Sequence, residues 1–115
     1  MRNGKWLALL LISATVFVGG CANDVGRLKR EGISEFQVGR TEKAAKLLQQ
    51  ALDQSPADSE TLYYMGRVAH SQGKFELAAF YYSSAVDADP TNQEARKWLV
   101  RAKQDGGYEQ PAADR

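Results

Sequence analysis

Residues 59–92 read SETLYYMGRVAHSQGKFELAAFYYSSAVDADPTN, and their pattern indicates an all-helical fold. Two groups of apolar residues in it recur at helical spacing, one before Gly73 and one after it. The groups are Leu62, Met65, Ala69 and Ala78, Tyr82, Ala85. Because glycine accepts the left-handed backbone that often ends a helix, the stretch predicts two helices joined by a turn at Gly73.

The same pattern occurs in the segment directly before it, residues 25–58. Aligning the two segments gives nine identical pairs, where unrelated sequences of ordinary composition would give about two. The pairs are Leu28/Leu62, Gly32/Gly66, Gly39/Gly73, Glu42/Glu76, Ala44/Ala78, Ala45/Ala79, Ala51/Ala85, Asp53/Asp87 and Pro56/Pro90. The small residues predict close helix crossings, Gly39 and Gly73 predict turns, and the two prolines predict where the second helices stop.

The period and these residues resemble the tetratricopeptide repeat (TPR), a helix-turn-helix of about 34 residues. The resemblance implies an all-α solenoid with one repeat at residues 25–58 and a second at 59–92. The first copy departs from the second at Glu31, Thr41 and Leu48, which stand where Met65, Phe75 and Tyr82 stand in the second. Glu31 places a charge on the expected apolar stripe, so we expect loose packing of the first helix.

A fifth helix follows the two repeats. Thr91 and Glu94 have the spacing of a capping box, and Gly106-Gly107 predicts the helix end. An apolar stripe lies between them at Ala95, Trp98, Leu99 and Ala102. We interpret residues 93–105 as a capping helix that covers the second repeat, and 106–115 as a polar tail. The expected helices are 24–38, 41–54, 58–71, 75–88 and 92–104. Two and a half repeats predict marginal stability alone and possible self-association.

Residues 1–20 differ in kind from the rest of the chain. They carry Arg2 and Lys5, no acid, and an uncharged apolar run from Leu7 to Val18. Twelve helical residues span only about 18 Å, too short for a bilayer core of about 30 Å. This pattern favours a secretory signal peptide over a membrane-spanning or buried helix.

The sequence Val18-Gly19-Gly20-Cys21 resembles the lipobox of bacterial lipoproteins. The resemblance implies cleavage before Cys21 and acylation of its thiol, which makes residues 21–24 a lipidated N-terminus and short tether. The alternative is a free buried cysteine that behaves as a small hydrophobe. Ala22 stands where an Asp would signal inner-membrane retention in enteric bacteria, so the periplasmic face of the outer membrane is the favoured location.

Composition excludes several classes of protein. The chain has 15 bases and 14 acids, and removing residues 1–20 leaves 13 bases and 14 acids, which does not favour a nucleic-acid binder. One Cys and one His exclude a disulfide framework within the chain and a Cys/His zinc site. The sequence has no phosphate loop, dinucleotide fingerprint or nucleophile elbow. We therefore predict no catalytic residue, metal or cofactor, and interpret His70 as a surface or groove histidine rather than a catalytic one.

In TPR arrays the first helix of each pair faces the concave side. The resemblance therefore implies a partner-binding groove lined by Lys29, Ile33, Phe36, Tyr63, Arg67, His70, Lys97 and Arg101. Cations and aromatics in such a groove suit an extended or helical peptide with acidic groups, although a merely solvated face is the alternative. Lys29 fits the TPR clamp for chaperone C-termini, but Ile33 and Tyr64 stand where that clamp has Asn, so this partner class is not expected.

These features predict a membrane-anchored, non-enzymatic TPR lipoprotein that binds a protein partner in the bacterial cell envelope. Small lipoproteins of this kind resemble assembly factors and pilotins for pili and secretion channels. The alternative is an accessory subunit or regulator of an envelope enzyme, such as one that acts on peptidoglycan.

Overall fold

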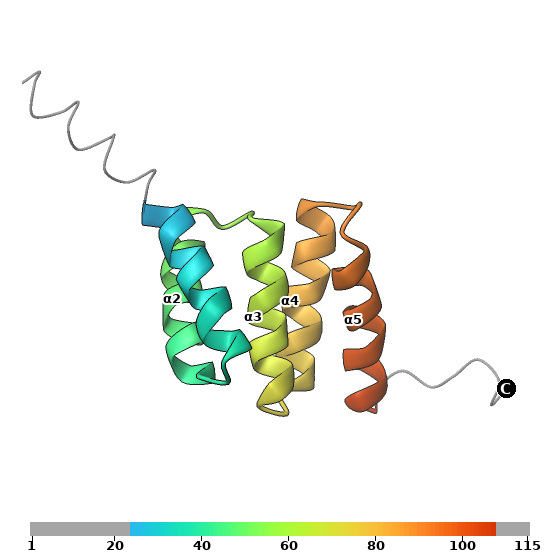
Figure 1. Ribbon diagram of the computed structural model, residues 1–115. Coiled ribbons are helices and arrows are strands. Elements are labelled where there is room, and N and C mark those ends of the chain that lie inside the picture. Colours follow the sequence, from blue (N-terminus) through green and yellow to red (C-terminus); the bar gives the residue numbers. More distant parts are fainter. Residues whose placement is uncertain (1–23, 108–115) are drawn as a thin grey trace, which may run out of the picture.

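Five helices follow one another in residues 24–107, the part of the chain that the computed structural model describes (Figure 1). The chain is helical from residue 24 to 37, and the next helices are α2 (Thr41–Gln54), α3 (Ser59–Ser71), α4 (Phe75–Ala88) and α5 (Gln93–Asp105). These bounds agree with the predicted ones to within one residue and confirm the all-α class. The predicted signal peptide, Cys21 and tail residues 108–115 lie outside the described residues.

The helices form a row in which neighbours run in opposite directions (Figure 1). α3 packs against α2 and α4, and α4 packs against α5. One hydrophobic cluster joins α2, α3, α4 and α5 around Leu48, Met65, Ala85 and Ala95, and a second joins α3, α4 and α5 around Tyr82. No helix in the described part of the chain is long and apolar enough to cross a membrane.

Glycine and alanine allow the two helices of each repeat to approach closely, as the sequence predicted. A Cβ added to Gly32 would lie 2.8 Å from Leu48 Cγ, and one added to Gly66 would overlap the ring of Tyr82. Two alanines of each second helix are fully buried or nearly so. They are Ala44, Ala51, Ala78 and Ala85.

The turns also follow the sequence. Gly39 and Gly73 have φ of +85° and +75°, the left-handed region that side chains disfavour. Pro56 and Pro90 lie in the turns after α2 and α4. The helix-turn-helix period is therefore present in the backbone as well as in the sequence.

The N-terminal cap of α5 corrects one prediction. Asn92, not Thr91, caps the helix, and its side chain accepts a hydrogen bond from the Ala95 amide at 3.0 Å. The Thr91 hydroxyl instead donates a hydrogen bond to Asp89 Oδ1 at 2.6 Å, so Thr91 does not cap α5. Asp58 caps α3 in the same way by accepting from the Thr61 amide at 3.1 Å, one repeat period earlier.

The position of Glu31 corrects a second prediction. Its side chain is exposed and pairs with Arg27 at 3.2 Å, so no charge enters the core. Met65, at the equivalent position of α3, is buried in the cluster shared with α2. Within the described residues no helix lies on the outer side of the first helix, so the position that is buried in α3 faces solvent here.

The outer side of α5 differs from the equivalent sides of the earlier first helices. Val100 occupies the position of Gly32 and Gly66 and is 48% exposed. Arg96 and Lys103 occupy the positions of Leu62 and Ala69, which are buried in α3. Within the described residues α5 therefore has no second helix packed on this side, and its side chains do not suit one.

Candidate functional site

The first helix, α3 and α5 together line a hollow of about 160 Å³ on one face of the row. We call this hollow the inner groove, and its lining residues are Phe36, Arg67, His70, Ser71 and Trp98. Three of the sequence-predicted site residues, Phe36, Arg67 and His70, are thus brought together from two helices.

Arg67 lies at the centre of the inner groove and is held by aromatic side chains. Its guanidinium carbon lies 3.9 Å from the centroid of the Trp98 ring and 5.5 Å from that of Phe36. Its Nη1 donates a hydrogen bond to the Tyr63 hydroxyl at 2.9 Å. Stacking of a guanidinium on an indole ring stabilises the pair by about 0.5–2 kcal/mol and fixes the plane of the cation.

The charge of Arg67 is not neutralised from within residues 24–107, where no carboxylate lies within 4.0 Å of its guanidinium. Only Nη1 makes a hydrogen bond there, so other N–H groups of the fork remain for a ligand. A planar cation held in this way suits the oxygens of a carboxylate.

His70 connects α3 to the end of α5. Its Nε2 lies 2.8 Å from Asp105 Oδ2, and its ring meets the rings of Phe75 and Trp98 edge-on at 5.2 Å. The imidazole is 12% exposed, and its Nδ1 is buried without a hydrogen-bond partner among the described residues. Through these contacts His70 holds α3 and α5 together at the rim of the inner groove.

Lys29 and Ile33 of the first helix have neighbours within the protein. Lys29 Nζ lies 3.1 Å from Glu60 Oε2 and 3.4 Å from Asp58 Oδ2, at the start of α3. Burial alone lowers the pKa of Lys29, but the hydrogen bond with Glu60 and the charge of Asp58 outweigh it, so the pKa is raised. Ile33 is half-buried and packs against the main hydrophobic cluster.

The remaining predicted residues lie around the same face. Tyr63 is half-buried and holds Arg67 through its hydroxyl. Lys97 is exposed on α5. Arg101 is also exposed, with its guanidinium carbon 5.9 Å from the Trp98 centroid and its Nε 3.8 Å from Asp105 Oδ2.

Trp98 was assigned from the sequence to the capping contact alone. The structure gives it two roles, because one face of the ring stacks on Arg67 while the residue also packs against the cluster around Tyr82. A signal for this was present, since shifting the chain by one repeat aligns Trp98 with Tyr64 of the concave helix. Ser71 was not foreseen, and no pattern in the sequence marks it.

Other chemistry is not apparent in the described residues. Within residues 24–107 no group of three or more His, Cys, Asp or Glu side chains could hold a metal ion. Tyr82, whose pKa burial raises, has a buried hydroxyl without a partner in this part of the chain. It packs against Trp98 and Tyr63 and does not line the inner groove.

A row of paired antiparallel helices with a groove on one face defines a helical-repeat domain. The family model described as tetratricopeptide repeat matches residues 29–93, which include nearly all of both repeats, and the chain belongs to this family. Such repeats are typical of scaffolds for protein–protein interaction, which is the class of function that the match supports. A comparison with curated proteins returned no match.

Proposed function

We propose that this protein is a scaffold whose inner groove binds a carboxylate-bearing segment of a protein partner. The observation that carries the proposal is Arg67, a cation stacked on Trp98 and hydrogen-bonded to Tyr63, with no carboxylate beside it in residues 24–107. A partner carboxylate would complete the hydrogen bonding of the guanidinium, and the Phe36 and Trp98 rings would contact its apolar neighbours.

The scaffold is proposed to act in the bacterial cell envelope, anchored through an acylated Cys21 to the periplasmic face of the outer membrane. The support is the pattern of residues 1–22: a basic start, a short apolar run, the lipobox-like Val18–Cys21 and Ala22. Two or more acyl chains would give stable anchoring, where a single chain gives only marginal binding.

Assembly of a pilus or secretion complex is the envelope process we propose, with regulation of a peptidoglycan enzyme as the alternative. A crosslinking pull-down from membranes distinguishes them, because it recovers either secretin or pilin components or a wall synthase or hydrolase. Recovery of neither class would contradict both.

The groove is tested with Arg67→Gln. This change removes the charge but keeps a side chain that can donate to the Tyr63 hydroxyl. Loss of one member of a desolvated charge pair costs about 2–5 kcal/mol, so we expect partner affinity to fall at least about 30-fold. Arg40→Gln is the matched control, because Arg40 is exposed in a turn and pairs only with Glu35 in the described part of the chain. Equal binding by Arg67→Gln and wild type, with helical content unchanged, would remove the groove from consideration.

The anchor is tested separately with Cys21→Ser. The variant is expected to retain residues 1–20 and to leave the detergent phase, because a serine hydroxyl does not accept the acyl chain in place of the thiol. Mass spectrometry of the wild-type protein from its host gives the decisive reading. A wild-type mass with residues 1–20 intact and no acyl group would contradict the lipoprotein assignment.

A further inference from the structure

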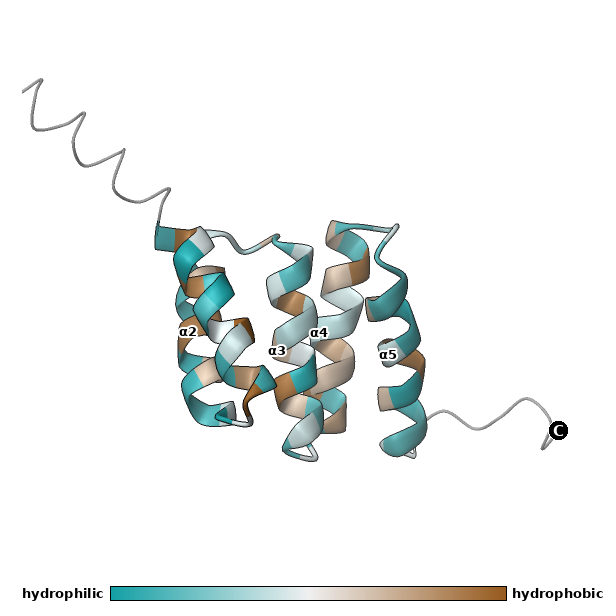
Figure 2. Cartoon of the chain, viewed as in Figure 1, coloured by the Kyte–Doolittle hydropathy of each residue, from teal (hydrophilic) through white to brown (hydrophobic). Residues whose placement is uncertain are grey.

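The outer side of α4 is apolar where the outer side of α2 is charged. Leu77 and Phe80 are 42% and 64% exposed, whereas the residues one repeat earlier are Lys43 and Lys46. Figure 2 shows α4 pale or brown over most of its visible length. A helix that is apolar around most of its circumference is normally covered by another element, and the described residues supply no cover for Leu77 and Phe80.

A second hollow lies on the outer side of α2, beside Met65 of α3. α3 packs against both α2 and α4, and one hydrophobic cluster joins the three helices. The hollow has a volume of about 400 Å³, is floored by Met65 and is bounded on the α2 side by Ala45, Lys46, Gln49 and Gln50.

α4 approaches this hollow through the hydrophobic cluster that contains Met65. Tyr81 packs half-buried against the cluster that contains Met65. Leu77 precedes it by four residues and therefore lies on the same side of α4. Phe80 lies beside them, with its ring 5.7 Å from that of Tyr81. We call the hollow together with Leu77, Phe80 and Tyr81 the outer groove.

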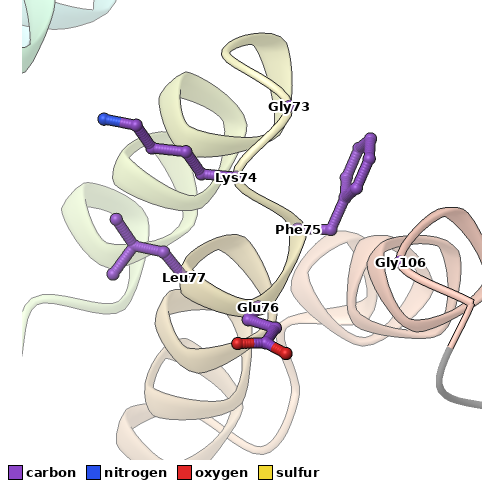
Figure 3. Close-up of a pocket in the computed structure, with 6 residues that line it drawn as sticks. All are labelled: Gly73, Lys74, Phe75, Glu76, Leu77 and Gly106. Atoms are coloured by element: carbon purple, nitrogen blue, oxygen red, sulfur yellow. The ribbon is translucent and has the colours of Figure 1, made fainter.

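Two lysines on this outer face have no neutralising partner in the described part of the chain. Within residues 24–107, no carboxylate lies within 4.0 Å of the ammonium of Lys46 or of Lys74. Lys43, by contrast, pairs with Glu35 at 3.0 Å. Figure 3, a view of the open hollow at the α3–α4 turn, shows Lys74 and Leu77 extending to one side of the chain while Phe75 points the other way toward α5. The outer groove thus combines an apolar surface with two available positive charges.

We propose that the outer groove binds an acidic amphipathic segment of a partner protein. Its apolar side chains would enter the hollow over Met65 and cover Leu77 and Phe80, while its carboxylates would pair with Lys46 and Lys74. The site is formed by α2, Met65 of α3, Lys74 and α4, and it shares no residue with the inner groove, so it stands independently of the function proposed for Arg67.

Two other occupants fit the outer groove less well. A bilayer surface cannot fill a recess whose floor is a buried methionine. In addition, α4 begins at the lower edge of the row, whereas residue 24, three residues after the proposed anchor Cys21, lies at the upper edge (Figure 1). A second copy of the chain stacked end to end is disfavoured by the residues at both ends of the row. Arg27 and Glu31 stand where Thr61 and Met65 are buried in α3, and Arg96 and the exposed Val100 stand where Leu62 and Gly66 are buried in α3.

The test is a titration of the full chain in nanodiscs of zwitterionic lipid. The probe is a labelled amphipathic peptide of Leu, Ala and Glu, about 18 residues long so that it makes about five helical turns. The same peptide with Lys in place of Glu is the charge control, and empty nanodiscs give the blank. We expect the acidic peptide to bind and the basic one to bind at least about tenfold more weakly.

Variants locate the peptide on the protein. Phe80→Ser and the double change Lys46→Glu/Lys74→Glu are each expected to weaken binding about tenfold or more, and exposed positions of this kind leave the fold intact. Val38→Ser, at an equally exposed apolar residue outside the site, and Arg67→Gln are expected to change it less than about twofold.

Several results would overturn the proposal. Failure of the wild type to bind the acidic peptide contradicts it, and so does binding by Phe80→Ser that equals binding by the wild type. Loss of peptide binding in Arg67→Gln alone would assign the peptide to the inner groove. Dimerisation that depends on Phe80 and is not displaced by the peptide would make the face a self-association surface. Binding only to phosphatidylglycerol vesicles would make it a membrane surface.

Discussion

Gly66→Ala tests how closely α3 and α4 approach, because the new methyl group would overlap the ring of Tyr82. An alanine in a helix interior is favoured over glycine by about 1 kcal/mol, so propensity alone predicts a more stable protein. The packing predicts the reverse. The Tyr82 side chain is fully buried, and its ring lies 6.0 Å from that of Tyr63 and 6.3 Å from that of Trp98, measured between centroids.

The ring cannot move away without displacing these neighbours, so the cost belongs at the upper end of the range for overpacked cores, about 3 kcal/mol. Subtracting the gain in propensity leaves a net loss of about 2 kcal/mol in the free energy of unfolding. For a domain of this size that loss lowers the melting temperature by about 8–16 °C.

Urea denaturation followed by circular dichroism measures the difference, with a soluble version that begins at Ala22. Gly26→Ala is the matched control, because a Cβ there would meet only the end of the Arg30 side chain, at 3.3 Å. The control is expected to gain up to about 1 kcal/mol. A Gly66→Ala variant as stable as the wild type, or two variants that respond alike, would refute the packing argument.

Three further predictions concern stability. Trp98→Ala should lower the free energy of unfolding by about 3 kcal/mol, which is the low end for a large aromatic because Trp98 is only partly buried. A thermal midpoint that does not move would show that α5 is not a cap. Gly73→Ala should cost about 1–2 kcal/mol from backbone strain alone, since nothing lies within 4 Å of the new Cβ, and a neutral urea midpoint would contradict this. Burial alone raises the pKa of Asp58, but hydrogen bonds from Thr61 and the charge of Lys29 outweigh it and leave the pKa lowered. The contribution of ionised Asp58 to the free energy of unfolding is therefore complete above its unfolded pKa of about 3.9. That contribution is lost as the pH falls through the lower pKa of the folded protein. Asp58→Asn should accordingly lose less stability than the wild type between pH 7 and pH 3, and equal losses would assign the acid sensitivity to other carboxylates.

The backbone of this protein was predictable because its determinants are local. Glycine at positions 39 and 73 indicates a left-handed φ without any knowledge of the surrounding structure. Because the repeat is regular, a helix boundary recognised in one copy predicts the same boundary in the other. The small size of Gly66 was also readable, although only the structure identifies Tyr82 as the ring that needs the space.

Side-chain partners were less predictable, because they depend on which groups the fold brings together. Thr91 had the spacing of a cap, but Asp89 accepts its hydroxyl hydrogen bond and Asn92 takes over the cap. Glu31 looked like a core charge because the helical pattern carries no information about whether a neighbouring helix is present.

The candidate site was predictable as a face and not as a set of contacts. The repeat placed Phe36, Arg67 and His70 on one side of the array, and the structure brings all three to one hollow. Spacing could not reveal that Lys29 pairs with Glu60 of the next repeat, or that Trp98 stacks on Arg67.

Val100 restricts how a protein of this kind could grow by gene duplication. An additional second helix joined after α5 would meet the Val100 side chain where Gly32 and Gly66 leave no room even for a methyl group, and Arg96 and Lys103 would be trapped beside it. Copies of residues 59–92 inserted before α5 would meet no such obstacle, since Asp58 and Asn92 cap their helices in the same way and Met65 would again face the helix before it. We therefore expect a longer array to arise from repeats inserted before α5, with α5 kept as the last helix of the array.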